Sequence, residues 1–269
     1  AIGPSSFASV DKTPLKVLQS KGLEVINNPY ARKLTENEII RHLQGVDGLI
    51  AGLEPLNSNV FQQSPDLKVI ARVGIGMENV DIDAAKINNI IVSNTPDGPT
   101  DSVAEMTLAA ALSLSRNILQ ANDAFHKKYW KKSIGIGLKN INVLIVGYGR
   151  IGRTVADLFR VMGSQILVCD PLVDQKKLQY GEILLELNEG LKLADIITLH
   201  AGGDSPILTV SEFEIMKKGV IILNSARGNL INENALINAL DSGKVSSAWL
   251  DVFWNEPYKG KLTKYNQVL

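Results

Sequence analysis

Short apolar runs alternate with amphipathic stretches along nearly the whole chain. In the first hundred residues, the amphipathic stretches carry helix signals: Pro14 stands in the first turn of a helix that ends at Gly22, and Thr35 begins another with a capping box to Glu38. Strands separated by such helices favour a parallel sheet covered by helices. The apolar runs that predict strands in this part are 23–27, 47–52, 68–73 and 90–92.

A second series of the same kind fills the rest of the chain. Its predicted strands are nearly all apolar, as is typical of a parallel sheet that is covered on both faces. We therefore predict an α/β protein with two parallel-sheet domains. The second series predicts strands at 141–147, 164–170, 195–200, 219–225 and 245–252, and helices at 150–163, 187–193, 211–217 and 232–241.

The stretch between the two series predicts one long helix over 102–128. Ser102 and Glu105 have the spacing of a capping box, and no Gly or Pro interrupts the residues that follow. A helix of this length is suited to joining two domains. The sequence therefore predicts a first domain over 1–95 and a second over 96–269 that includes this helix.

A glycine motif carries the clearest chemistry. Gly147, Gly149 and Gly152 follow a predicted strand directly and open a helix, which is the G-x-G-x-x-G pattern of a dinucleotide site. The helix start offers free N–H groups to phosphates. Asp170 ends the next predicted strand, where a carboxylate accepts hydrogen bonds from the adenosine ribose and repels a 2′-phosphate. No Arg stands beside it, so the pattern favours NAD over NADP.

Three charged residues follow strands of the second series. Arg227 lies just after one, where a guanidinium can hold a carboxylate or ketone oxygen in a fork of two hydrogen bonds. Asp251 ends the last complete strand, in place to meet a nicotinamide, and Glu256 follows in place to orient and charge a partner base. From the residues alone, the alternative remains that all three are solvated loop side chains.

Composition narrows the possible partners. Lys+Arg and Asp+Glu both number 28, and the short basic run at 126–132 reads as the solvated end of a helix, so we expect no nucleic-acid partner. No run approaches the roughly 18 apolar residues of a membrane span, so no membrane partner is expected. The single cysteine, Cys169, lies in an apolar strand and fits a reducing, cytoplasmic setting. No metal site is expected.

Several motifs in this order resemble one known family. "VGYGRIG", "CDP", "NSARGNLINENAL" and "DVFWNEP", together with "ARVGIGMENVD" at 71–81 and "TPDGPTDSVAE" at 95–105, are similar to the D-isomer-specific 2-hydroxyacid dehydrogenases, which include 3-phosphoglycerate dehydrogenase. The resemblance implies a flavodoxin-like substrate-binding domain over 1–95, completed by a C-terminal segment, and an NAD-binding Rossmann domain over 96–269. It implies hydride transfer between NAD and a small D-2-hydroxyacid or 2-ketoacid, in a homodimer.

The resemblance also implies roles for individual residues. Arg227 would bind the substrate carboxylate and carbonyl oxygen, helped by backbone N–H groups of Val73, Gly74, Ile75 and Gly76. Gly52 and Leu53 stand where phosphoglycerate-specific members carry an Arg, which weakens that substrate. The residues expected to contact the cofactor are Gly147, Gly149, Arg150, Ile151, Gly152, Asp170, His200, Ala201, Ala226 and Asp251.

Glu256 in this family pairs with a histidine that passes a proton to or from the 2-hydroxyl. That histidine follows the next strand, and the sequence reads as the start of that strand at 267–269. His42, His126 and His200 do not fit the position, so we expect residues 1–269 to lack the catalytic histidine and to be inactive by themselves. The alternative is a catalytically silent NAD(H)-binding module with a regulatory or co-repressor-like role.

Overall fold

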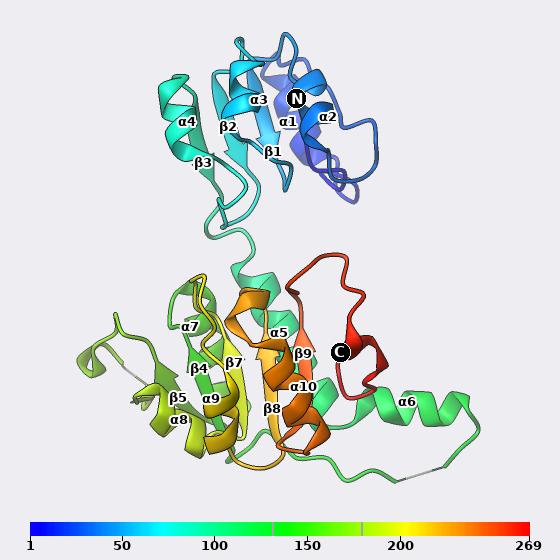
Figure 1. Cartoon of the computed structure of the whole chain (residues 1–269), viewed down its shortest axis with the longest axis vertical. Coiled ribbons are helices and arrows are strands. Elements are labelled where there is room, and N and C mark those ends of the chain that lie inside the picture. Colours follow the sequence, from blue (N-terminus) through cyan, green and yellow to red (C-terminus); the bar gives the residue numbers. More distant parts are fainter. Residues whose placement is uncertain (131, 179) are drawn as a thin grey trace. The chain divides into compact units, whose positions relative to one another are not determined.

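The chain forms two compact units in a computed structural model that describes residues 1–130, 132–178 and 180–269. The first unit is Ala1–Pro99 and the second is Thr100–Leu269 (Figure 1). The division falls four residues after the sequence-based boundary at 95. The second unit begins at Thr100 because the helix that starts there packs against other elements of this unit.

The first unit contains a parallel sheet of three strands in the order β1-β2-β3. The predicted strands at 47–52, 68–73 and 90–92 are confirmed as β1 (Gly48–Ala51), β2 (Val69–Arg72) and β3 (Ile91–Asn94). The helices of this unit are α1 (Thr13–Ser20), α2 (Glu36–His42), α3 (Ser58–Gln62) and α4 (Ile82–Ile87), and the capping box between Thr35 and Glu38 is formed.

The strand predicted at 23–27 is wrong. The segment is extended but irregular, and its Ile26 carbonyl accepts a backbone hydrogen bond from Ile2 N–H at 2.9 Å. Residues 1–3 lie between it and β1, where Ile2 pairs with Ile50 in a parallel bridge. A ladder needs several successive partners, and so short a neighbouring segment offers too few backbone groups to form one.

One face of the first sheet is covered and the other is open. Residues of α2, α3 and α4 pack in one cluster with Leu49 and Ile70, which point to the same face. On the opposite face, Val69 is 41% exposed and Ile91 is 71% exposed. Parallel strands are usually buried on both faces, so this open face is an apolar surface of the first unit.

The second unit contains six parallel strands in the order β6-β5-β4-β7-β8-β9. The chain leaves β4 toward β5 on one side and later returns to pair β7 on its other side. This point of reversal is where α/β sheets usually bind ligands, beyond the carboxyl ends of the strands. The strands are β4 (Asn142–Val146), β5 (Gln165–Cys169), β6 (Ile183–Leu184), β7 (Ile196–Leu199), β8 (Val220–Asn224) and β9 (Val245–Leu250).

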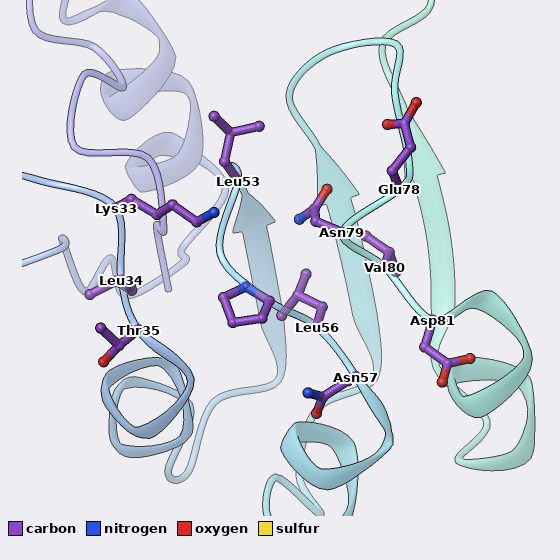
Figure 2. A pocket seen from close by; sticks show the side chains of 11 residues that line it. Lys33, Leu34, Thr35, Leu53, Leu56, Asn57, Glu78, Asn79, Val80 and Asp81 are labelled. Atoms are coloured by element: carbon purple, nitrogen blue, oxygen red, sulfur yellow. The ribbon is translucent and has the colours of Figure 1, made fainter. Parts of the chain in front are cut away.

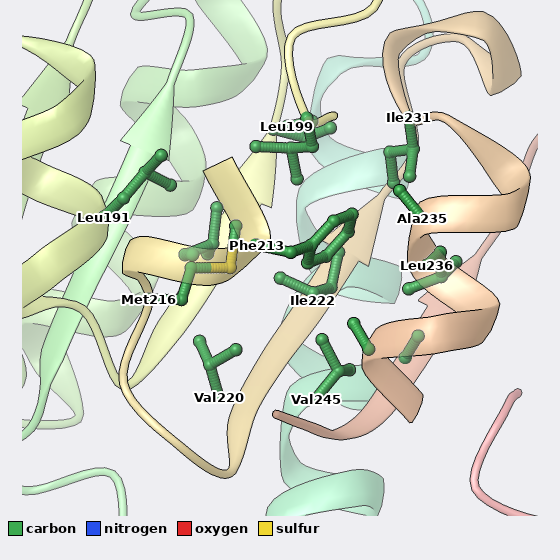
Figure 3. Packing of buried hydrophobic residues seen from close by; sticks show 14 of the residues in the cluster. Leu191, Leu199, Phe213, Met216, Val220, Ile222, Ile231, Ala235, Leu236 and Val245 are labelled. Carbon is green, nitrogen blue, oxygen red and sulfur yellow. The ribbon is translucent and has the colours of Figure 1, made fainter. Parts of the chain in front are cut away.

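Helices cover both faces of this sheet, as the apolar strands predict. α5 and α7 contribute to one buried cluster, and α8, α9 and α10 contribute to the other. Figure 3 shows Phe213 of α9 packed over Ile222 of β8 in the second cluster. The α-helices of this unit are α5 (Thr100–Ser115), α6 (Ile118–His126), α7 (Arg150–Val161), α8 (Leu187–Leu193), α9 (Val210–Ile215) and α10 (Glu233–Asp241).

The single long helix predicted over 102–128 is wrong, because it is interrupted between α5 and α6. Asn117 has a left-handed backbone (φ 53°), and its side-chain amide donates to Ile134 O at 3.1 Å. The freed Ser115 carbonyl accepts from Ile136 N–H at 2.8 Å. The capping box at Ser102 is also wrong, since that residue lies inside α5. In the basic run at 126–132, α6 ends at His126 and Lys131 lies outside the described residues.

Residues 267–269 extend the second sheet beside β9. Ala248 N–H donates to Gln267 O at 3.0 Å, and Leu269 N–H donates back to Ala248 O at 2.9 Å. Val268 therefore forms a parallel bridge with Ala248. Because this is a single bridge, the strand predicted to begin at these residues stays a prediction.

Candidate active site

The carboxyl edge of the second sheet gathers most of the residues that the sequence singled out. Strands β4, β7, β8 and β9 run directly into Gly147, His200, Ser225 and Asp251. Contacts link these strand ends: Gly147 lies against His200, and the His200 ring lies 3.4 Å from Ser225 Oγ. Asp251 N–H donates to the carbonyl of the last β8 residue at 2.9 Å.

The glycine turn after β4 shows two different reasons for its glycines. Gly147 has a left-handed backbone (φ 91°), and a Cβ there would lie 2.5 Å from Ala201 N. A Cβ on Gly152 would collide with Gly147 O. Gly149, by contrast, has open space where its Cβ would stand and an ordinary φ of −74°. Two glycines are therefore required by the fold, and the third leaves room beside the turn.

The start of α7 supplies hydrogen-bond donors at this room. Gly149 is its N-cap and makes no side-chain cap, and Arg150 and Ile151 are its first two residues. The first N–H groups of a helix have no acceptor within the helix. These groups, at the positive end of a helix of 12 residues, are suited to a pyrophosphate.

Asp170 closes the same site from the end of β5. Its Oδ2 accepts from Tyr148 N–H at 2.7 Å, and its Oδ1 accepts from Leu172 N–H at 2.8 Å. A carboxylate has about four acceptor positions, so each oxygen keeps one for another donor. Asp170 can therefore accept both ribose hydroxyls of a bound NAD, and the residues at this edge fit the cofactor.

Arg227 stands on a turn that a buried amide holds. Asn224 is fully buried at the end of β8; its Oδ1 accepts from Ala226 N–H at 3.0 Å and its Nδ2 donates to Arg227 O at 2.8 Å. The Arg227 side chain itself is exposed, and its Nη1 donates to Ala226 O at 2.7 Å. Asn224 is absent from the predicted site, although a single amide at the end of an otherwise apolar strand is a usable signal.

Gly228 brings the Arg227 turn against the loop that carries Glu256. A Cβ on Gly228 would collide with the Phe253 carbonyl and lie 2.7 Å from Trp254 N. Trp254 strengthens this contact, because its Nε1 donates to Ile231 O at 2.7 Å. The sequence did not predict this role of Gly228, which only the packing of two loops reveals.

Glu256 is exposed on that loop. Its Oε1 accepts from Phe253 N–H at 3.1 Å, which folds the carboxylate over its own loop. Among the described residues, the three histidines lie on other elements: His42 bonds with Ile2 O at 3.0 Å in the first unit, His126 ends α6, and His200 follows β7.

His200 is an internal part of the edge. One ring nitrogen lies 2.8 Å from Thr198 Oγ1, and the other faces Ser225 Oγ. Burial lowers the pKa of His200 from 6.5 to about 4. The imidazole is therefore neutral at physiological pH, which suits a side chain that contacts a nucleotide better than one that exchanges protons.

This pKa predicts a loss of stability in mild acid. The unfolded chain takes up a proton on His200 near pH 6.5, whereas the folded chain does so only near pH 4. Stability from this group is therefore complete above pH 6.5 and is lost as the pH falls toward 4. We expect the free energy of unfolding of the wild type to drop by about 3 kcal/mol more than that of His200→Asn over this range. Urea unfolding at several pH values measures it, and parallel curves for the two proteins would contradict it.

The loop at 73–76 in the first unit is held by hydrogen bonds from its backbone to neighbouring residues of the same unit. Gly74 has a φ of 130°, and its N–H donates to Thr95 Oγ1 at 2.8 Å. Val73 N–H donates to Ala51 O at 2.9 Å. These two N–H groups are thus engaged within the unit, and carboxylate binding by Ile75 and Gly76 stays a prediction.

A hollow of about 560 Å³ opens beside the ends of β1 and β2 in the first unit (Figure 2). Leu53 is 58% exposed in its lining, and Figure 2 shows the Lys33 side chain extending toward the loop that carries Leu53. The hollow thus combines apolar side chains with one cationic group, Lys33, and two carboxylates, Glu78 and Asp81. Its wall at 78–81 begins two residues after the last residue of the loop at 73–76.

Curated relatives match the chain over most of its length. It is 36% identical to a D-3-phosphoglycerate dehydrogenase from Pongo abelii over 260 residues, which cover 94% of the chain and 48% of that relative. It is also 36% identical to a D-3-phosphoglycerate dehydrogenase from Methanocaldococcus jannaschii over 255 residues, which cover 91% and 48%. The chain spans about half the length of these relatives.

Solved structures agree with this similarity. A D-isomer specific 2-hydroxyacid dehydrogenase from Polaromonas superposes with a TM-score of 0.88 at 28% identity, covering 96% of this chain and 84% of that one. The D-lactate dehydrogenase from Escherichia coli superposes with a TM-score of 0.87 at 26% identity, covering 100% and 86%. Within the described residues, no helix is long and apolar enough to cross a membrane.

The family assignment rests on the larger part of the chain. Residues 108–269 match the family described as D-isomer specific 2-hydroxyacid dehydrogenase, NAD binding domain. The match contains the glycine turn, Asp170 and the loops of Arg227 and Glu256. The chain therefore belongs to the D-isomer-specific 2-hydroxyacid dehydrogenases, and its second unit is their NAD-binding Rossmann domain.

Proposed function

We propose that the full-length protein is an NAD-dependent oxidoreductase that interconverts a small D-2-hydroxyacid and its 2-ketoacid. The observation that carries the proposal is the contact through Gly228, which packs the turn of Arg227 against the loop of Glu256. Both loops lie at the sheet edge that carries the glycine turn. A nucleotide site, a cation for an anionic substrate and a carboxylate for proton chemistry thus belong to one edge.

Arg227 would bind the substrate. Its guanidinium can donate to a carboxylate oxygen and to the oxygen on C2, where negative charge develops when a ketone is reduced. The buried Asn224 holds the backbone of this turn, so the Arg227 side chain extends from a fixed Cα position. When bound, NAD supplies the nicotinamide ring that exchanges a hydride with C2 of the substrate.

Glu256 would assist proton transfer through a partner histidine. A carboxylate beside an imidazole stabilises its charged form and raises its pKa, which prepares the ring to give a proton to the new hydroxyl. By family resemblance, we propose that the partner histidine follows the strand that begins at 267–269. Protonated at that position, it would neutralise the alkoxide that forms on C2.

The first unit would contribute the substrate-binding domain. The N–H groups of Ile75 and Gly76 would face the substrate carboxylate, since those of Val73 and Gly74 are engaged within the unit. The neighbouring hollow offers apolar surface and Lys33, beside two carboxylates, for a substituent on C3. The open face with Val69 and Ile91 supports the proposal that a further segment of the full-length protein completes this domain.

We also propose a homodimer, supported by α6, on which Phe125 is 70% exposed and Ile118 is 51% exposed.

A second function is consistent with the same nucleotide site. The Glu256 carboxylate folds onto its own loop, and His200 is engaged by Thr198 and Ser225. A protein with this arrangement and no further histidine would bind NAD(H) without turnover and serve as a regulatory or co-repressor-like module. The two functions differ in turnover and agree in binding.

The test is NADH oxidation by the purified full-length protein with glyoxylate, pyruvate, hydroxypyruvate and phosphohydroxypyruvate. We expect turnover with at least one of them, and slower turnover when NADPH replaces NADH, because Asp170 faces the ribose position. NADH binding in a fluorescence titration without turnover on any ketoacid would favour the regulatory function. Absence of both would reject the two proposals together.

A further inference from the structure

The glycine turn has a side chain on its inner side that none of the roles above uses. Tyr148 stands between Gly147 and Gly149, is only 7% exposed, and points into the unit. Its hydroxyl donates to Glu182 Oε1 at 3.0 Å. Because Glu182 directly precedes β6, this bond ties the turn after β4 to the far edge of the sheet.

Glu182 is a buried carboxylate with several partners. Its side chain is 1% exposed and forms an ion pair with Arg160 of α7, while its Oε2 accepts from Tyr180 N–H at 2.9 Å. Although burial opposes ionisation, hydrogen bonds from the Glu182 and Tyr180 backbone hold the pKa of Glu182 below its usual value. Burial, assisted by the bond to Glu182, raises the pKa of Tyr148 to about 12. The phenol therefore stays protonated and the carboxylate stays charged, which keeps the bond between them formed.

The backbone of Tyr148 faces the nucleotide side. Its N–H donates to Asp170 Oδ2 at 2.7 Å, and its carbonyl accepts from Arg153 Nε at 3.1 Å. The Arg153 guanidinium also lies over the Tyr148 ring, 5.6 Å from its centroid. One residue thus connects a buried, charge-assisted anchor to the carboxylate that faces the ribose.

We propose that Tyr148 is a positioning residue that fixes the Asp170 carboxylate for the adenosine ribose and thereby sets the preference for NAD over NADP. Anchored through Glu182, the turn holds one oxygen of Asp170 in place, while Leu172 N–H holds the other. The free acceptor positions then point to the ribose hydroxyls and place negative charge where a 2′-phosphate would stand. The inference concerns nucleotide binding alone and does not depend on the hydride-transfer proposal.

The first test is Tyr148→Phe, which removes the hydroxyl and keeps the ring. Without the anchor, the turn no longer holds the Asp170 carboxylate for the ribose hydroxyls, so we expect the Kd for NADH to rise about tenfold. The Kd for NADPH should change by less than about twofold, since Asp170 repels its phosphate already. Fluorescence titrations with NADH and NADPH measure both, and an equal rise for the two nucleotides would overturn the proposal.

A double-mutant cycle with Asp170→Asn separates positioning from general stability. If Tyr148 acts through Asp170, adding Tyr148→Phe to Asp170→Asn should weaken NADH binding by less than about twofold. Effects that multiply would mean that the two residues act independently, and the proposal would fail. Tyr265→Phe is the matched control, because it also removes a phenol that donates to a carboxylate, Asp241, at 2.8 Å, but on another part of the unit. It should leave both Kd values unchanged.

Thermal unfolding without nucleotide shows whether each variant folds. Should Tyr148→Phe not fold, Glu182→Gln tests the same anchor: it keeps an oxygen for the phenol and removes the charge that strengthens the bond. As with Tyr148→Phe, the Kd for NADH should rise more than the Kd for NADPH, so the ratio of the NADPH Kd to the NADH Kd should fall. An unchanged ratio would reject the anchor. If the wild type binds no NADH at all, the nucleotide site itself fails, an outcome distinct from unchanged binding by the variant.

Discussion

Replacing Arg227 by alanine is expected to lower kcat of the full-length protein by about a thousandfold while NADH binding changes by less than about twofold. The guanidinium would stabilise charge on the oxygen at C2, and removal of one such donor typically costs about 10²–10³ in rate. The fold should survive, because Asn224 holds the turn from within and the Arg227 side chain is exposed. Steady-state NADH oxidation and a fluorescence titration on the same preparation measure the two quantities.

Arg227→Lys is the matched control for charge. It keeps the cation and loses the planar fork, so we expect a kcat between that of the wild type and that of Arg227→Ala. Parallel losses of turnover and NADH affinity in both variants would show that Arg227 serves the nucleotide instead of the substrate.

Gly149→Ala is expected to abolish NADH binding without affecting the fold. A methyl group there meets no protein atom within 4 Å and the backbone is ordinary, so the expected loss of stability is only that of a poorer N-cap, about 1 kcal/mol or less. The pyrophosphate, however, must approach this backbone closely. We expect the Kd for NADH to rise by at least about a hundredfold, which corresponds to about 2.8 kcal/mol.

The neighbouring glycines define the controls for this result. Gly152→Ala should destabilise the protein itself by about 1–3 kcal/mol, because its Cβ meets the Gly147 carbonyl. Gly137→Ala also introduces a methyl group into open space, in the segment that leads into the amino end of β4, and should change neither property. Wild-type NADH affinity in Gly149→Ala would mean that the pyrophosphate does not pass over this turn.

Much of the fold could be predicted from sequence because its signals are local. Every strand of the second sheet except β6 reads as an apolar run of about the observed length, and β6 is missed because two residues carry no period. The prediction of one long helix is wrong because the interruption depends on a contact that is not local. Its composition remains typical of a helix past Ser115, but the backbone turns at Asn117, whose side chain bonds to Ile134, 17 residues later.

The candidate site divides in the same way. Gly147, Gly149, Gly152 and Asp170 stand within one β-α-β unit, so their spacing alone identifies a dinucleotide turn. The motifs around Arg227 and Glu256 indicated a family, and the family match agrees with it. No local pattern showed which backbone donors are already engaged, as the N–H groups of Val73 and Gly74 are.

The sequence by itself therefore determined the two-domain α/β architecture, the dinucleotide motif and the family, because periodicity and turn chemistry act over neighbouring residues. Only the tertiary structure decided which loops share an edge and what holds them: Gly228 against Phe253, and Tyr148 on Glu182. Each of these contacts joins residues brought together by packing or by buried hydrogen bonds between separate elements. Such contacts depend on the three-dimensional path of the chain, which no local pattern in the sequence specifies.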